Sequence, residues 1–229
     1  MIHHAVEPGS SEWFRLHMGI PTAGNMHLII TPARWLYSKS ARPYAFRLAA
    51  EVLLQEMTMP LSGIEQMERG KAMEPLAVQM YEFAERVESA PCGFLTTDDG
   101  AVGATPDRLL PGQNAALEVK CPSNWVHLQY LIDGFGSDYL PQVFGQMLVG
   151  EFDYVDRYSF HPRMPPRLVR TVRDHERITT LAFILKQFCE ERDAIIEKAR
   201  AEGLFEPGRA LPLDQAYGEF GRMMPEDEP

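Results

Sequence analysis

The residues whose types and spacing could do chemistry are Thr105-Pro106-Asp107 and, eleven positions after the aspartate, Glu118-Val119-Lys120. They lie in two strand-like runs, residues 102–110 and 115–121, which are joined by Pro111-Gly112-Gln113-Asn114. Proline, glycine and asparagine are residues that tight turns favour, so the sequence predicts a hairpin here. A hairpin can bring the aspartate of the first run to the acid and lysine of the second.

Alternation of side chains along the second strand sharpens this prediction. Glu118 and Lys120 should share one face, while Leu117 and Val119 suit a core on the other. With Asp107, the shared face would hold two carboxylates and an ammonium. Carboxylates can bind Mg²⁺, the metal can generate a nucleophilic hydroxide and offset phosphate charge, and the lysine can orient or help deprotonate the water. The set indicates metal-assisted phosphodiester cleavage, although Glu-x-Lys alone is also common on solvated strands.

Other polar residues could join this centre. Glu74 lies on a helical segment beside core-facing positions, just before the predicted strands, so its carboxylate could reach the same metal. Gln142 and Gln146 are four residues apart and therefore share one helix face among apolar neighbours. These amides either bond to nearby backbone or line a polar cleft. The histidines show no metal-ligand spacing, and the sequence contains no nucleophile elbow or glycine-rich phosphate loop.

Composition bounds the class of protein. The chain has 229 residues, of which 45% are hydrophobic and 24% charged, as in an ordinary globular domain. There is no signal peptide pattern and no membrane-spanning apolar run, and the three cysteines fit no disulfide or metal framework. A cytoplasmic location is therefore expected. The net charge of -10 argues against a general nucleic-acid coating protein but not against a nuclease, and residues 34–47 are locally basic.

The elements that must position the candidate centre follow from periodicity and turn signals. A central mixed β-sheet flanked by α-helices is predicted, within a single domain over residues 1–203. An acidic, Pro/Gly-rich and loosely ordered tail is expected over 204–229. The predicted helices cover 12–16, 23–30 with Thr22 as cap, 44–57, 63–85 with a kink or start at Pro75, 125–132, 139–149 and 174–201; the predicted strands cover 92–96, 102–110, 115–121, 154–161 and 167–172.

Taken in order, these residues resemble a known family over about residues 8–200. The family is that of phage lambda exonuclease and its YqaJ-like alkaline exonuclease relatives, within the PD-(D/E)-x-K nuclease superfamily, and it implies a restriction-endonuclease-like α/β core. The matching motifs are Glu12-Trp13-x-Arg15-x-x-x-Gly19-Ile20-x-Thr22-Ala23, Arg69-Gly70-x-x-x-Glu74, Thr105-Pro106-Asp107, Leu117-Glu118-Val119-Lys120-Cys121-Pro122 and Tyr139-x-x-Gln142-Val143-x-x-Gln146.

The resemblance implies an activity and an assembly. The expected activity is processive 5′-to-3′ digestion of linear double-stranded DNA from ends with a 5′-phosphate, leaving a 3′ overhang. It implies two Mg²⁺ ions, for which Mn²⁺ can substitute, and a ring-shaped homotrimer. It also implies a single-strand annealing protein as partner and no association with a membrane. The protein would come from a phage or prophage and act in the cytoplasm of the bacterial host.

The resemblance also implies roles for individual residues. Asp107, Glu118, the main-chain carbonyl of Val119 and Glu74 would bind metal. Lys120 would position the attacking water, with Gln142 near it. The expected 5′-phosphate contacts are Arg34, His17 and the segment Thr22, Ala23 and Gly24.

This sequence departs from the family pattern where end recognition is expected. The best-known member has a serine at the position of Gly24, an arginine at that of His17 and a second glutamine at that of Phe144. A restriction-type or nicking endonuclease with the same core remains an alternative, as does an inactive DNA-binding or scaffold protein, or an α/β enzyme unrelated to DNA.

Overall fold

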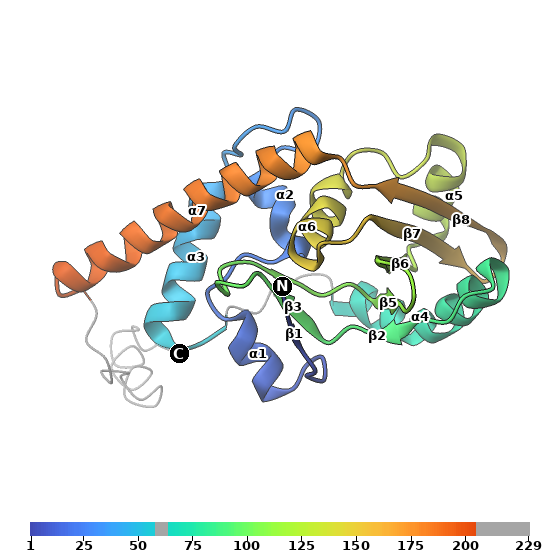
Figure 1. The fold of residues 1–229 in the computed structure, drawn as a ribbon, viewed down its shortest axis with the longest axis horizontal. Coiled ribbons are helices and arrows are strands. Elements are labelled where there is room, and N and C mark those ends of the chain that lie inside the picture. The colour runs from blue at the N-terminus through green and yellow to red at the C-terminus, as the bar shows by residue number, and fades with distance from the viewer. Residues whose placement is uncertain (58–63, 205–229) are drawn as a thin grey trace, which may run out of the picture.

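The computed structural model describes residues 1–57 and 64–204, the side chains of 64–69 and 71 excepted (Figure 1). A five-stranded mixed sheet carries the candidate centre. Its order is β2-β5-β6-β7-β8; β6 and β7 run parallel and the other neighbours antiparallel. This confirms the predicted α/β class. The strands are β2 Ala90–Pro91, β5 Arg108–Leu110, β6 Ala115–Lys120, β7 Tyr154–His161 and β8 Met164–Val172. The first residue of the helix predicted over 63–85, and the predicted tail from 205 on, lie outside the described residues.

Helices cover both faces of this sheet. On one face, α4 packs its residues Ala77 and Tyr81 against Leu117 and Val119. On the other face, α6 lies between the sheet and the long helix α7, with α2 and α3 beside them (Figure 1). The helices are α1 Ser11–His17, the short 3-10 helix η1 Ala23–Asn25, α2 Met26–Ile29, α3 Ala41–Leu54, α4 Ile64–Glu85, α5 Asn124–Asp133, α6 Leu140–Gly150 and α7 His175–Ala201.

The predicted alternation along β6 is confirmed. Leu117 and Val119 belong to the core beneath α4, whereas Ala116 packs in the core beneath α6. Glu118 therefore points to the α6 side, where it is 3% exposed rather than solvated. A strand buried on both faces thus carries one carboxylate into the protein, and such a charge requires partners.

The predicted strand over 102–110 is wrong in one respect, because it is two strands. Gly103–Ala104 forms β4 and Arg108–Leu110 forms β5, and the two belong to different sheets. The break falls at Thr105-Pro106-Asp107. Proline has a fixed φ and lacks the N–H that would donate to a neighbouring strand, so the sheet cannot continue through it. The break frees Asp107 from the ladder and turns it toward β6.

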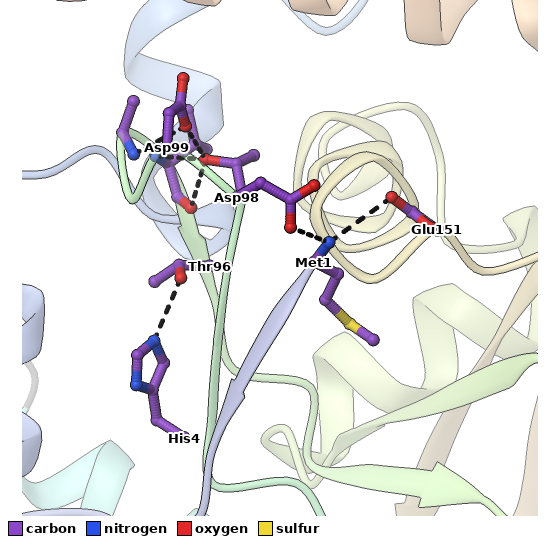
Figure 2. Close-up of polar contacts among 9 residues, drawn as sticks. Met1, His4, Thr96, Asp98, Asp99 and Glu151 are labelled. Atoms are coloured by element: carbon purple, nitrogen blue, oxygen red, sulfur yellow. Dashed lines mark hydrogen bonds and ion pairs between the residues drawn. The ribbon is translucent and has the colours of Figure 1, made fainter.

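The second sheet has three strands in the order β1-β3-β4, with β1 at Ile2–His4 and β3 at Phe94–Thr96. The sequence did not predict β1. Figure 2 shows how it is held: the amino group of Met1 lies 2.5 Å from Asp98 Oδ1 and 3.7 Å from Glu151 Oε1, and His4 Nε2 lies 3.1 Å from the Thr96 hydroxyl. These contacts fix β1 to the β3–β4 turn and to the end of α6.

Three further helix predictions can be compared with the structure. The helix expected over 23–30 is split into η1 and α2, and the Thr22 side chain makes no cap hydrogen bond. Pro75 does not interrupt α4 within the described backbone. Asp174 caps α7 as predicted, accepting from the N–H groups of Glu176 and Arg177. No described helix is both long and apolar enough to span a membrane.

Candidate active site

Asp107 is the first residue of the centre, and the break before β5 positions it. Its Oδ2 accepts a hydrogen bond from the Val119 N–H at 2.6 Å. Arg108 pairs with Leu117, so Asp107, one residue before β5, lies next to Glu118. Burial raises the pKa of the Asp107 carboxyl well above its ordinary value, and the negative charge of Glu118 adds to this effect. Two carboxylates are thus held close together in a poorly solvated place.

Glu118 is buried but fully engaged. Its Oε1 accepts from Lys120 Nζ at 2.6 Å and from Gln142 Nε2 at 2.7 Å. Its Oε2 accepts from Gln146 Nε2. Both glutamines come from α6, because residues four apart share a helix face. The carboxylate is therefore clamped by one strand neighbour and one helix.

Lys120 completes the group at the end of β6. Burial alone would lower the pKa of its ammonium, but the charges of Glu118 and Asp107 and the hydrogen bond to Glu118 outweigh burial and raise it. The ammonium also lies 5.3 Å from the centre of the Tyr139 ring. In this arrangement Lys120 is therefore a cation, which suits the orienting of water or phosphate.

Glu74 lies near the centre without joining a closed ligand set. It is half-buried on α4, and its negative charge contributes to the raised pKa of Asp107. However, no three His, Cys, Asp or Glu side chains in the described part of the chain gather closely enough to hold a metal ion. Both central carboxylates instead accept hydrogen bonds from the protein itself. Asp107 accepts from the Val119 N–H, and Glu118 accepts from Lys120 and the two glutamines.

The donor set nevertheless suits a hard divalent cation. Carboxylate and carbonyl oxygens are the ligands that Mg²⁺ prefers. The negative charges of Glu118 and Glu74 both disfavour ionisation of Asp107, and a bound cation would relieve this repulsion. In addition, Gln146 Oε1 is buried beside Glu118 with no hydrogen-bond partner among the described residues. An unsatisfied acceptor next to a carboxylate pair fits a site that receives a cation or its water.

The segment predicted to bind a terminal phosphate packs on α6 and β4, two elements next to this centre. Thr22 bridges to Gly103, just before the Asp107 break, and η1 packs on α6. The close approach needs Gly145, whose added Cβ would lie 3.2 Å from the Ala23 backbone. Gly24 is exposed and has open space around it. Arg34 is exposed on the loop between α2 and α3. These placements leave the phosphate roles as predictions.

His17 is placed differently from its predicted role. It is 8% exposed, between the rings of Trp13 at 3.5 Å and Phe94 at 3.9 Å. Its Nδ1 lies 2.7 Å from the Trp13 carbonyl and its Nε2 3.3 Å from the Thr105 hydroxyl. Burial lowers the pKa of the ring to about 4. A neutral ring with both nitrogens engaged is poorly suited to a phosphate, so the structure argues against that assignment.

Of two further residues near the centre, the sequence left Gln146 undecided and did not mark Arg157. The pairing of Gln146 with Glu118 was one of two open alternatives for that amide, and its spacing from Gln142 was the signal that could have decided it. Arg157 of β7 stands in register beside Glu118. No local pattern marks it, because the pairing joins strands far apart in sequence.

Comparison with known proteins adds independent information. Residues 12–153 match the family model for the YqaJ-like viral recombinase domain. Among solved structures, an alkaline exonuclease (LHK-Exo) from Laribacter hongkongensis is similar at 24% identity and a TM-score of 0.75, covering 85% of this chain and 98% of its own. Its complex with dAMP is similar at 25% identity and 0.76, with the same coverage. A phage-related exonuclease from Haemophilus somnus 129PT aligns at 14% identity and 0.64, covering 78% of this chain and 96% of its own. No curated protein matches.

Proposed function

The chain belongs to the YqaJ-like viral recombinase domain family, and we propose that it is a Mg²⁺-dependent exonuclease of linear double-stranded DNA. It digests the 5′-ended strand in the 5′-to-3′ direction and leaves a 3′ single-stranded overhang for phage-type recombination. The family and the similar exonuclease structures support a nuclease role. The observation that carries the proposal is the convergence of Asp107, Glu118, Lys120 and Gln142 at one point of the sheet.

In this proposal Asp107, Glu118, Glu74 and the Val119 carbonyl hold the metal. When bound, Mg²⁺ supplies Lewis-acid charge that offsets the negative phosphate and favours deprotonation of water. Binding through Oε1 would require Glu118 to exchange one of its present donors, since that oxygen already accepts from Lys120 and Gln142, whereas Oε2 accepts only from Gln146. Lys120 is the donor whose release leaves a cation free to orient the attacking water or the phosphate.

The residues of α6 have separate tasks. Gln142 is half-buried and shares Glu118 Oε1 with Lys120, so its amide can turn to a water on the open side. Gln146 is fully buried and holds Oε2 from behind. The first glutamine serves the nucleophile and the second fixes the carboxylate that must bind metal.

The wider assignments rest on the family alone and extend the same proposal. They are two Mg²⁺ ions, replaceable by Mn²⁺, a homotrimeric ring through which DNA passes, and an annealing protein that loads on the exposed strand. A closed ring would explain how a chain of net charge -10 stays on DNA. Light-scattering mass tests the trimer: a mass near 26.0 kDa, the size of a single chain, would remove it.

One experiment tests the activity. The protein is incubated with Mg²⁺ and end-labelled duplexes, linear and circular, with and without a 5′-phosphate. The expected result is stepwise loss of the 5′-ended strand from linear DNA, faster with the phosphate, and none from closed circles. Cutting of circles would favour the endonuclease alternative. Lys120→Ala should abolish cleavage but leave DNA and metal binding largely intact, and unchanged cleavage would remove the assigned centre.

A further inference from the structure

Arg157 occupies an unusual position on β7. It pairs in register with Glu118 on β6, and Asp107 lies just before β5 on the other side of that glutamate. Two neighbouring strands therefore place the glutamate and the arginine side by side. Residues paired across neighbouring strands point to the same face, here the face beneath α6. Arg157 is 7% exposed.

Its guanidinium lacks the partners that a buried charge requires. Nε and Nη1 are buried and have no hydrogen-bond partner among the described residues. Two other arginines of the chain are satisfied: Arg170 makes a bidentate pair with Asp156, and Arg173 donates to two main-chain carbonyls. Arg47 has a single buried atom of this kind, Nε, whereas Arg157 has two. A buried, unpaired charge is strongly unfavourable. The arrangement therefore implies an acceptor that is bound only when the protein works.

An aromatic ring covers the guanidinium but does not replace that acceptor. Phe135 lies with its ring centre 4.9 Å from the Arg157 carbon Cζ. A ring interacts through its face, whereas the N–H bonds of arginine lie in the guanidinium plane. Phe135 is flanked by Gly134 and Gly136, whose φ values of 79° and 64° are in the left-handed region. This loop can shift more readily than a helix or strand, and a shift would open the arginine to a ligand.

We infer that Arg157 binds a phosphodiester of the DNA strand held at the candidate active site. The inference rests on the proposed function, since it needs DNA beside Asp107 and Glu118. The planar fork of arginine matches two phosphate oxygens, and it remains charged when burial disfavours the charge. Asp107 and Glu118 would then hold the metal, and Arg157 of β7 would hold the backbone of the DNA strand. This is a second phosphate contact, separate from the Arg34 loop.

The test compares Arg157→Met and Arg157→Lys with the control Arg167→Met. Arg167 lies exposed on β8 of the same hairpin. Duplex binding is measured with Ca²⁺ in place of Mg²⁺, over a range of salt. The expected loss for Arg157→Met is about tenfold, the size of a charge-assisted pair, with a salt slope lower by about one. Arg157→Lys should recover part of the affinity, and Arg167→Met should change little.

A phosphate scan identifies the contact. Duplexes in which single linkages near the 5′ end are replaced by neutral methylphosphonates are titrated with each variant. One linkage should weaken binding of the wild type but not of Arg157→Met, so that the two changes are not additive. Thermal melting without DNA should show that Arg157→Met is at least as stable as the wild type, because it removes an unpaired buried charge.

The outcomes separate the two proposals. A wild type that neither binds nor cuts DNA removes the proposed function itself. A wild type that cuts, with Arg157→Met showing an unchanged phosphate profile or only a lower melting temperature, leaves the function standing and overturns the Arg157 contact. Weaker binding of a free 5′-mononucleotide, without any linkage effect in the duplex, would also overturn it by assigning the arginine to product.

Discussion

Replacing Gln146 by leucine should reduce the affinity of the candidate site for Mg²⁺ while leaving the fold almost intact. Gln146 is completely buried and donates to Glu118 Oε2, the oxygen that no other described residue is seen to contact. Leucine has a similar volume but no donor. Glu118 would keep Lys120 and Gln142 on Oε1, yet nothing would fix the direction of its second oxygen.

Two opposing contributions set the cost in stability. Loss of a hydrogen bond to a charged group costs about 1.5–3 kcal/mol. The same substitution removes Gln146 Oε1, a buried acceptor without a described partner, whose burial costs about 1–3 kcal/mol. The net loss of unfolding free energy should therefore be at most about 2 kcal/mol. No such offset applies to the affinity for Mg²⁺, because a carboxylate ligand that is no longer held in place binds the ion less well. Loss of a residue that orients a metal ligand typically costs about 10–100-fold in affinity or activity.

The assay is the rate of 5′-strand loss as a function of Mg²⁺ concentration, with urea unfolding alongside. Gln146→Leu should raise the Mg²⁺ concentration for half-maximal rate by about 10–100-fold, and saturating Mg²⁺ should restore most of the rate. Gln142→Leu is the matched control on the same helix. Because Gln142 shares its contact with Lys120, its loss should lower the rate at every Mg²⁺ concentration and shift the half-maximal point less.

An unchanged Mg²⁺ dependence in Gln146→Leu, in protein shown to be folded, would refute this reasoning. It would mean that Glu118 does not need its second oxygen directed, or that Glu118 is not a metal ligand. A rate that saturating Mg²⁺ cannot restore would instead place Gln146 with Gln142 in positioning the nucleophile.

Three further predictions concern titration and stability. Asp107→Asn should abolish cleavage yet raise the melting temperature of the metal-free protein. Because the pKa of Asp107 is raised in the folded state, the unfolding free energy falls as pH rises from 3.8 through that raised value. Asparagine does not titrate and so avoids this loss. In the wild type the pKa of the His17 ring is near 6.5 unfolded and about 4 folded, so the unfolding free energy falls by about 3 kcal/mol as pH drops through that window. His17→Phe should remove this pH-dependent loss, which urea unfolding between pH 7 and pH 4 measures. Asp156→Asn should lower the unfolding free energy measured in urea by about 2–3 kcal/mol. This is less than for a fully buried pair, because Arg170 is 47% exposed and can reach water. A change below about 1 kcal/mol would mean that the pair contributes little.

Much of the fold was predictable because local patterns and tertiary packing agree. Along β6 the alternation that buries Leu117 also directs Glu118 to α6, so one short run of sequence places both core and site. Helix α7 begins one residue after its predicted cap, since Asp174 offers a side-chain acceptor to the first free N–H groups. Where cap chemistry was absent, as at Thr22, a predicted helix was found split into two short pieces.

The remaining features depend on contacts between distant segments. Nothing near His17 in the sequence indicates that Phe94 will cover its ring and add to the burial that lowers its pKa. The parallel pairing of β6 with β7 likewise puts Arg157 beside Glu118 across 38 residues of intervening chain. Register of this kind is set by which faces must be buried together, so it cannot be deduced from either strand alone.

Helix α6 gives a physical reason to expect that the departure at Phe144 affects end recognition rather than the metal centre. Its Gln142 and Gln146 face Glu118, while Phe144 points elsewhere, 3% exposed and edge-on to Trp35 at 5.2 Å. Trp35 follows Arg34, so an apolar contact from α6 anchors the loop that carries the predicted phosphate ligand. A polar residue at 144 would lose that anchor without touching the carboxylates. Variation at 144 should therefore change how the DNA end is held and leave the cutting step alone.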